Sequence, residues 1–559
     1  MSPEKVEGSE SASIRIGYFK VSGESLFLFA CLICAFTIRF LLIPQNSVIN
    51  GDGAYYTLLG EKFASGDLSG GISAYWSPFY SILTGISSLL FHDRDFSGRF
   101  VSLVAGSLLI FPTYFFIREC FGRLSAYFGT ILVVFHPFLI RSSGWVMTES
   151  VYTLIFTLFV LSGWRALSKG GSRAFLTTGL LLGAAFLIKP EAIGYLTLML
   201  GLVIGSKLCC SNISWRRCGA NYLFLLLGFA FLFLPYFFFL HNKTGQWTVS
   251  QKITVNLPAA DFDGKFLGLS GDRRITMKDR IWGDDYETEY RTSTTPRTTN
   301  GRSFDSARFR SDIAILGSKT LTLLKKQVRD YLPTILPYPF IVLLFAGFFC
   351  RPWTRARAAR EIYVFSLVMS TLIGYAASTI EMRYLFPLTP ILIAWAANGI
   401  TEFGDWAVRS IRRIFGIARK LNPLFVDVLI LILLLGSLTP LFVSVFKTED
   451  IVDVPFEEKA AGLWIKDHAT RSIPVVMSSH ITAAYYAGAK HLYLPDEELS
   501  TIIEYAKLRK VDYVVFSERR MRDEPEIFGE ENGVPQDLKL VYRDASEPNF
   551  EVLVYQLSY

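Results

Sequence analysis

Residues 25–56 read SLFLFACLICAFTIRFLLIPQNSVINGDGAYY, and this stretch decides the class of the protein. Its first part, Ser25 to Ile43, is almost wholly apolar and has about the length of a helix that crosses a bilayer. The polar part that follows holds Asp52 between two glycines. A carboxylate at this place is costly beside lipid and is tolerated in a polar cavity. We interpret Asp52 as a candidate catalytic residue, with an exposed aspartate in a glycine-rich turn as the alternative.

Similar apolar runs recur along most of the chain. They are roughly 15 to 22 residues long and continue to residue 446, which predicts an α-helical polytopic membrane protein. The net charge is +7, but Lys and Arg lie in short connectors between these runs rather than on one face. This distribution argues against a nucleic-acid partner, and it is typical of connectors that face the cytoplasm.

The order of the runs predicts which polar residues share a side of the membrane. Residues 1–20 are polar and carry Lys5, Arg15 and Lys20, so the bias of basic residues toward the cytoplasm predicts a cytoplasmic N-terminus and an outer position for Asp52. Three apolar runs separate Asp52 from Glu149. The first of them, residues 76–91, is short and interrupted by glycine and serine, so we expect a juxtamembrane helix in the outer interface. Eleven transmembrane helices then result, and Glu149 returns to the side of Asp52.

Two long polar regions divide the chain further. We expect a transmembrane domain over residues 1–446, with outer loops at 45–97 and 241–330. The second loop is too long for an ordinary connection, so it is either functional or partly disordered. Residues 447–559 alternate between short apolar runs and a helical pattern, which predicts a small extracytoplasmic α/β domain.

Charged and aromatic residues gather at the predicted outer end. The candidates for binding a donor phosphate or substrate are Arg39, Tyr55, Trp76, Arg141, Lys189, Glu191 and Arg383. Together with the carboxylates of Asp52 and Glu149, these cations fit a reaction that neutralises a phosphate and activates a hydroxyl. Three of these residues also have a plainer interpretation: Arg39 could snorkel to the interface, Glu191 could neutralise Lys189, and Arg383 could pair with Glu381.

Other kinds of chemistry leave no signature in the sequence. The chain has no glycine-rich nucleotide loop, no serine elbow and no metal-type cluster of cysteine and histidine. We therefore assign no metal ligands, and participation of a divalent metal stays open.

Five short motifs in order resemble a known family. They are DGAY at 52–55, YWSPFY at 75–80, TES at 148–150, KPE at 189–191 and MRYLFP at 382–387. Their order and spacing are similar to those of the GT-C glycosyltransferases that use polyprenyl-phosphate sugars. The protein O-mannosyltransferases and the aminoarabinose transferases of lipid A are the branches that the chain resembles most.

The resemblance implies roles for the outer residues. Asp52 would orient or deprotonate the acceptor hydroxyl, and Glu149 matches the second acidic position of the family. Arg141, Lys189 and Arg383 would hold the lipid phosphate. The first motif departs from the commoner Asp-Glu of the family, and the second acid is Glu rather than Asp, so no branch is assigned.

The resulting expectation is an integral membrane glycosyltransferase, a hexosyl or pentosyl transferase. It would move a sugar from a polyprenyl-phosphate donor to a hydroxyl of a protein, lipid or glycan acceptor, with inversion, on the outer side of a bacterial inner membrane. The C-terminal domain would then lie in the periplasm. The alternatives are a transporter or flippase of lipid-linked saccharides, for which polar residues spread along several spans would be expected, and a non-catalytic scaffold.

Overall fold

The computed structural model describes most of the chain. The described residues are 13–16, 19–43, 48–209, 214–245, 247–250, 265–266, 269–270, 280–282, 288–290, 317–349, 352–377, 381–415, 422–446, 455–494, 499–518, 536–547 and 550–558. Most of the predicted 241–330 loop lies outside them.

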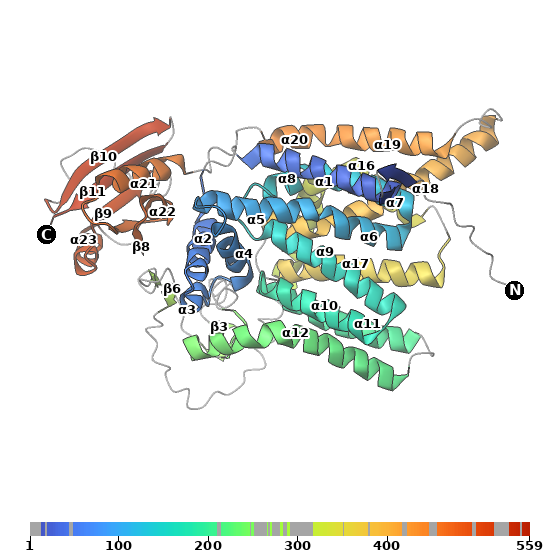
Figure 1. Ribbon diagram of the computed structural model, residues 1–559, viewed down its shortest axis with the longest axis horizontal. Helices are drawn as coiled ribbons and strands as arrows, with labels where there is room; N and C mark the ends of the chain where they lie inside the picture. Colours follow the sequence, from blue (N-terminus) through green and yellow to red (C-terminus); the bar gives the residue numbers. More distant parts are fainter. Residues whose placement is uncertain are drawn as a thin grey trace.

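A bundle of long helices forms the main body of the molecule (Figure 1). Its helices are α1 (Gly23–Leu42), α5 (Arg94–Leu108), α6 (Ile110–Phe121), α7 (Arg123–Val134), α8 (Pro137–Ser142), α9 (Glu149–Lys169), α10 (Ser172–Phe186), α11 (Ile193–Cys209), α12 (Trp215–Thr244), α15 (Leu332–Ile335), α16 (Tyr338–Phe349), α17 (Arg355–Ala376), α18 (Thr389–Phe415), α19 (Pro423–Ser437) and α20 (Thr439–Phe446). A hairpin of β1 (Ser13–Ile16) and β2 (Phe19–Ser22) precedes α1. Short 3₁₀ or π segments lie between helices of the bundle at η2 (Pro190–Ala192), η5 (Gln327–Tyr331) and η6 (Met382–Leu388).

The bundle has the composition of a membrane domain. Among the described residues, seven helices are long and apolar enough to cross a membrane, and an eighth is added if Gly317–Ile335 and Tyr338–Phe349, bent by 105°, form one span. The remaining three of the eleven expected spans fall on α7 with α8, on α10 and on α17. The helices α7 and α10 are shorter apolar helices, and α17 begins with a run of arginines.

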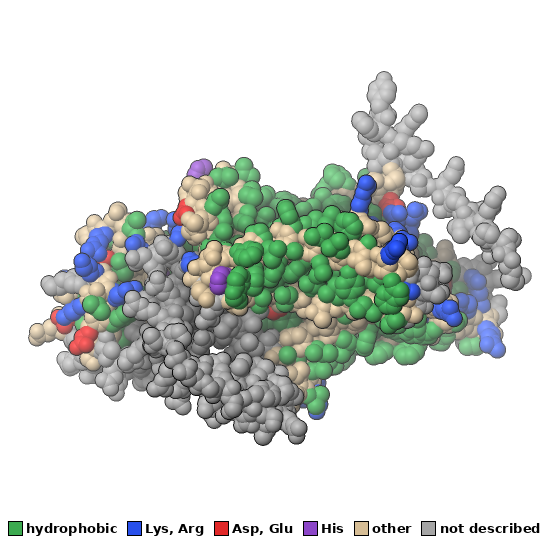
Figure 2. Space-filling view, turned by 90° about the horizontal axis from the view of Figure 1, so that it is seen from below, with side chains coloured by type: hydrophobic (Ala, Val, Ile, Leu, Met, Phe, Trp, Pro, Cys, Tyr) green, Lys and Arg blue, Asp and Glu red, His purple; other side chains and the backbone are tan. Residues whose placement is uncertain are grey.

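The outside of the bundle is apolar. Large side chains of α1 such as Phe29 and Leu41 are exposed, at 59% and 66%. Such exposure would be costly in water and costs little against lipid tails. Figure 2 shows hydrophobic side chains over the middle of one face, with Lys and Arg at the end remote from the C-terminal sheet and, on the left, over the C-terminal unit. The expected integral membrane protein is thereby confirmed.

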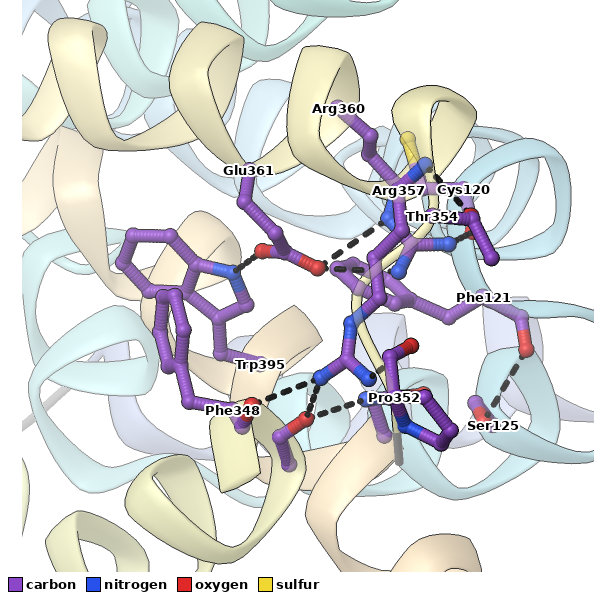
Figure 3. Close-up of polar contacts among 12 residues, drawn as sticks. Cys120, Phe121, Ser125, Phe348, Pro352, Thr354, Arg357, Arg360, Glu361 and Trp395 are labelled. Carbon is purple, nitrogen blue, oxygen red and sulfur yellow. Dashed lines mark hydrogen bonds and ion pairs between the residues drawn. The ribbon is translucent and has the colours of Figure 1, made fainter. Parts of the chain in front are cut away.

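Arg357 and Arg360, near the start of α17, link several helices at the end of the bundle remote from the C-terminal sheet (Figure 3). The buried carboxylate of Glu361 accepts a hydrogen bond from Trp395 Nε1 at 2.7 Å and pairs with Arg360 at 2.8 Å. Arg360 also lies over the ring of Phe121, 4.5 Å from its centroid. Arg357 donates to the last carbonyls of α16, where cations favour a helix end. These contacts join α6, α16, α17 and α18.

Three short helices lie at the opposite end, between the bundle and the C-terminal sheet (Figure 1). They are α2 (Gly51–Ala64), α3 (Leu68–Gly71) and α4 (Pro78–Ser88). The helix α4 is the short helix expected within 76–91, and its 11 residues are too few to cross a bilayer. It packs on α2 through a glycine contact, since a Cβ on Gly85 would lie 2.5 Å from the carbonyl oxygen of Gly60.

A mixed five-stranded sheet ends the chain. Its strand order is β10-β11-β9-β7-β8, with β7 parallel to β8 and β9, and β11 antiparallel to β9 and β10. The strands are β7 (Val475–Ser478), β8 (Lys490–Tyr493), β9 (Tyr513–Ser517), β10 (Leu538–Glu547) and β11 (Phe550–Leu557), and the helices are α21 (Phe456–His468), α22 (Thr482–Ala487) and α23 (Leu499–Leu508). Two apolar cores, one on each face, hold the sheet between its helices. A small C-terminal α/β unit was expected and is present.

Two further hairpins, β3 (Lys265–Phe266) with β4 (Leu269–Ser270) and β5 (Arg280–Trp282) with β6 (Thr288–Tyr290), belong to the long loop.

Candidate active site

Four charged side chains from distant parts of the sequence meet at the end of the bundle that faces the C-terminal sheet. We call Asp52, Glu149, Lys189 and Arg383 the charged cluster. Lys189 Nζ lies 3.1 Å from Glu149 Oε1. Arg383 lies 3.9 Å from Asp52 Oδ2 through Nη2 and 3.9 Å from Glu149 Oε1 through Nε. The two acids predicted to share a side of the membrane therefore share one arginine.

The first turn of α2 positions Asp52. The side chain of Asn50 caps the helix by accepting a hydrogen bond from the N–H of Gly53 at 2.7 Å. Gly53 lies against the loop before α9, because a Cβ there would be 2.5 Å from the carbonyl oxygen of Val146. The helix N-terminus favours the carboxylate of Asp52, whose side chain is 30% exposed.

Glu149 and Lys189 form a buried ion pair. Their side chains are 2% and 10% exposed. Pro190 disfavours the helical conformation at the residue before it, so α10 ends at Phe186 and Lys189 is extended (φ −136°, ψ 112°). Its ammonium lies over the rings of Tyr152 and Tyr384, at 5.6 Å and 4.9 Å. The aromatic faces and the carboxylate together stabilise this largely buried cation.

One oxygen of Glu149 is left for another partner. Its Oε1 receives both cations, while its buried Oε2 has no hydrogen-bond partner among the described residues. A buried carboxylate oxygen without a donor is costly in a finished structure. It marks a place where a substrate hydroxyl could donate.

Arg383 connects the charged cluster to the surface. It lies on η6, pairs with Glu381 at 2.5 Å and contacts Met147 Sδ at 3.9 Å. The hydroxyl of Tyr384 donates to the same Glu381 at 3.2 Å. Arg383 thus lies near three carboxylates, which hold its guanidinium in position. These three acids outnumber the two cations Lys189 and Arg383.

The carboxylates of the site also affect the buried Tyr56 of α2. Burial raises the pKa of the Tyr56 hydroxyl well above its usual value, and the carboxylates of Asp52 and Glu149 raise it further. Glu191 contributes in the same direction, and Arg383 opposes it. Tyr56 therefore stays a neutral phenol beside the site.

Tyr55 of α2 packs against Trp76, which lies just before α4. Their rings stack with centroids 5.1 Å apart, and both side chains are buried. The indole of Trp76 also meets the edge of Tyr56 at 5.5 Å. These contacts hold α2 on the segment that leads into α4.

Arg141 and Glu191 lie on the margin of the site. Arg141 on α8 lies over the ring of Trp145 at 5.3 Å, and that ring is 6.5 Å from Phe386 of η6. Glu191 is exposed on η2, two residues after Lys189.

Arg39 has a different environment from the one expected. It is fully buried, so it does not snorkel to the interface. It donates to the carbonyls of Val133 and Val134 at 3.5 and 3.4 Å and to Ser143 Oγ at 3.2 Å. Pro137 lacks the N–H that would complete the turn after Val133. Arg39 thus donates to carbonyl groups that the helix break between α7 and α8 leaves without a backbone donor.

Two tyrosines at the site escaped the sequence interpretation. Tyr152 follows Glu149 by three residues, a spacing that puts both on one face of α9. Tyr384 belongs to the MRYLFP motif, but a ring over a lysine is not visible before the fold is known. As for metal ions, the described residues contain no group of three or more His, Cys, Asp or Glu placed to hold one.

Comparisons with known proteins agree with this architecture. A family model described as dolichyl-phosphate-mannose-protein mannosyltransferase matches residues 76–248. No curated protein matches the chain by sequence. Among solved structures, ArnT from Cupriavidus metallidurans in the apo state superposes with a TM-score of 0.57 at 14% identity, covering 95% of this chain and 97% of that one.

Two further structures extend the likeness. ArnT from the same organism bound to undecaprenyl phosphate has a TM-score of 0.53 at 14% identity, with the same coverage of both chains. An oligosaccharyltransferase from Archaeoglobus fulgidus, tethered to an acceptor peptide, has a TM-score of 0.57 at 13% identity and covers 96% of this chain and 74% of its own. At these identities the matches show a shared fold.

Proposed function

We propose that this integral membrane protein, whose fold is that of the GT-C glycosyltransferases, moves a sugar from a polyprenyl-phosphate donor to an acceptor hydroxyl. The observation that carries the proposal is the charged cluster, in which Arg383 lies 3.9 Å from both Asp52 and Glu149. The family model and the ArnT structure with undecaprenyl phosphate support a lipid-linked donor.

The chemistry needs one base and a stabilised leaving group. The acceptor oxygen attacks the anomeric carbon, the bond from that carbon to the phosphate oxygen breaks, and the hydroxyl proton passes to a carboxylate. A single displacement of this kind inverts the anomeric centre. Polyprenyl phosphate leaves with additional negative charge, so cations fixed beside it lower the barrier.

Asp52 is the better base of the two acids. Its side chain is more exposed than that of Glu149, 30% against 2%, and a base must reach the incoming hydroxyl. Glu149 instead holds Lys189 and Arg383 in place, and its Oε2 can accept from a sugar hydroxyl. Arg383 and Lys189 would contact the leaving phosphate, with Arg141 as a further cation at the margin.

The transporter and scaffold alternatives have less support. The charged cluster lies at one end of the bundle, whereas a conduction path calls for polar groups along several spans. The arginines at the other end, Arg357 and Arg360, have structural partners. We propose a bacterial inner membrane as its location, with the C-terminal unit in the periplasm and a protein, lipid or glycan as the acceptor.

Replacement of Asp52 tests the proposal. In vesicles with labelled polyprenyl-phosphate sugar, Asp52→Asn should lower the transfer rate by about 100-fold or more, the usual contribution of a general base. The matched control is Asp67→Asn on the same polar segment, because Asp67 caps α3 and Asn caps equally well. Normal transfer by Asp52→Asn would refute the catalytic assignment.

A further inference from the structure

The C-terminal unit contacts the segment that carries Asp52. Its short helix α22 presents two consecutive tyrosines toward the bundle. The hydroxyl of Tyr486 accepts a hydrogen bond from the backbone N–H of Ile49 at 2.9 Å, three residues before Asp52. The same hydroxyl donates to Asp95 Oδ2 on α5, also at 2.9 Å. One phenol therefore joins the entry to α2, the first turn of α5 and the C-terminal unit.

The carboxylate that receives this bond is itself held. Asp95 pairs with Arg99 one turn further along α5, at 3.7 Å, and its side chain is 20% exposed. Because the carboxylate can only accept, the single hydrogen of Tyr486 goes to Asp95. Its oxygen is thereby left to receive the N–H of Ile49. This division of roles fixes the position of the backbone just before Asn50, which caps α2.

Two neighbouring contacts strengthen the connection. Tyr485 lies with its hydroxyl 3.3 Å from Thr57 Oγ1 and 3.4 Å from Asp95 Oδ1. His491 on β8 lies with Nδ1 3.4 Å from the hydroxyl of Tyr55. Residues 49–57 are thus contacted by the C-terminal unit on one side. On the other side, Gly53 abuts the loop that leads to Glu149.

We propose that Tyr486 is a positioning residue for Asp52, so that the C-terminal unit sets the place of the catalytic turn. The distance from Arg383 to Asp52 is 3.9 Å, at the outer limit of an ion pair. A small displacement of the first turn of α2 would separate the two. Displacements of about 1 Å are enough to lower catalytic rates by about 100-fold. The kinetic consequence rests on the proposed glycosyl transfer, while the mechanical link stands on the contacts alone.

Tyr486→Phe tests this role, with Tyr542→Phe as the matched control. Tyr542 is a tyrosine of the same unit whose hydroxyl donates to Asp544 at 3.0 Å, away from α2. In the full-length protein, Tyr486→Phe should lower kcat by about tenfold with the donor KM within about twofold, because position rather than binding is lost. Backbone hydrogen exchange should rise over residues 49–57. The control should change neither.

The possible outcomes separate the positioning role from a merely structural one. Unchanged kcat, or faster exchange throughout the C-terminal unit instead of locally at 49–57, would overturn the inference. If the wild-type protein transferred no sugar at all, the proposed function would fail. Hydrogen exchange would then decide the mechanical link by itself: a local rise in Tyr486→Phe supports it, and no rise overturns it.

Discussion

Lys189→Met is the change whose effect on stability follows most directly from the structure. At an effective dielectric constant of about 20, the Coulomb attraction to Glu149 is about 5 kcal/mol over the 3.1 Å from Lys189 and about 4 kcal/mol over the 3.9 Å from Arg383. Removing one partner of a buried ion pair typically costs about 3–5 kcal/mol. Because Arg383 still contacts the carboxylate, we expect a loss of about 3 kcal/mol.

Equilibrium unfolding in detergent micelles measures this loss. A matched control is Lys169→Met, which removes an exposed ion pair with Glu119 and should cost less than about 1 kcal/mol. The double variant Lys189→Met with Glu149→Leu should recover at least about half of the loss, since no buried carboxylate is then left short of a cation. If Lys189→Met were as stable as the wild type, the burial and pairing of Glu149 described above would be wrong.

Three further changes test other parts of the site. Gly53→Ala should lower transfer about tenfold, because its Cβ would meet the carbonyl of Val146 and push α2 away, whereas Gly194→Ala, with open space around it, should not. Arg383→Lys should lower transfer about 100-fold in the same assay, because one ammonium cannot bridge the carboxylates that the guanidinium fork reaches. Burial lowers the pKa of His491 to about 4. The neutral imidazole therefore contributes fully to the free energy of unfolding above about pH 6.5, and about 3 kcal/mol is lost as the pH falls from there through 4. Unfolding of His491→Gln, measured as a function of pH, should lack this dependence.

Much of the fold could be predicted from local sequence patterns. Apolar runs of crossing length and basic connectors are properties of short segments, and they led to the helical bundle and to the pairing of ends that brings Asp52 to Glu149. The buried position of Lys189 could be inferred in part from the sequence, because the apolar run before it is shorter than a full crossing requires. The short helix α4 could be predicted because residues 76–91 are too few, and too often interrupted by glycine and serine, for a membrane crossing.

Contacts between distant segments could not be predicted in this way. The partners of Arg39 depend on a helix break about a hundred residues further along the chain, so its burial was invisible in the sequence. Tyr486 meets Ile49 across more than four hundred residues, and nothing near either residue indicates the other. Strand β8, with only Lys490–Tyr493, is too short to give a clear alternating pattern.

The most direct test of the central claim is whether Asp52 and Glu149 occupy one site. In a chain whose seven native cysteines are replaced, the double variant Asp52→Cys with Glu149→Cys can be treated with a short bifunctional thiol reagent. The account predicts a cross-link within one chain, formed more slowly when polyprenyl phosphate is added. Absence of the cross-link in the folded protein would contradict it.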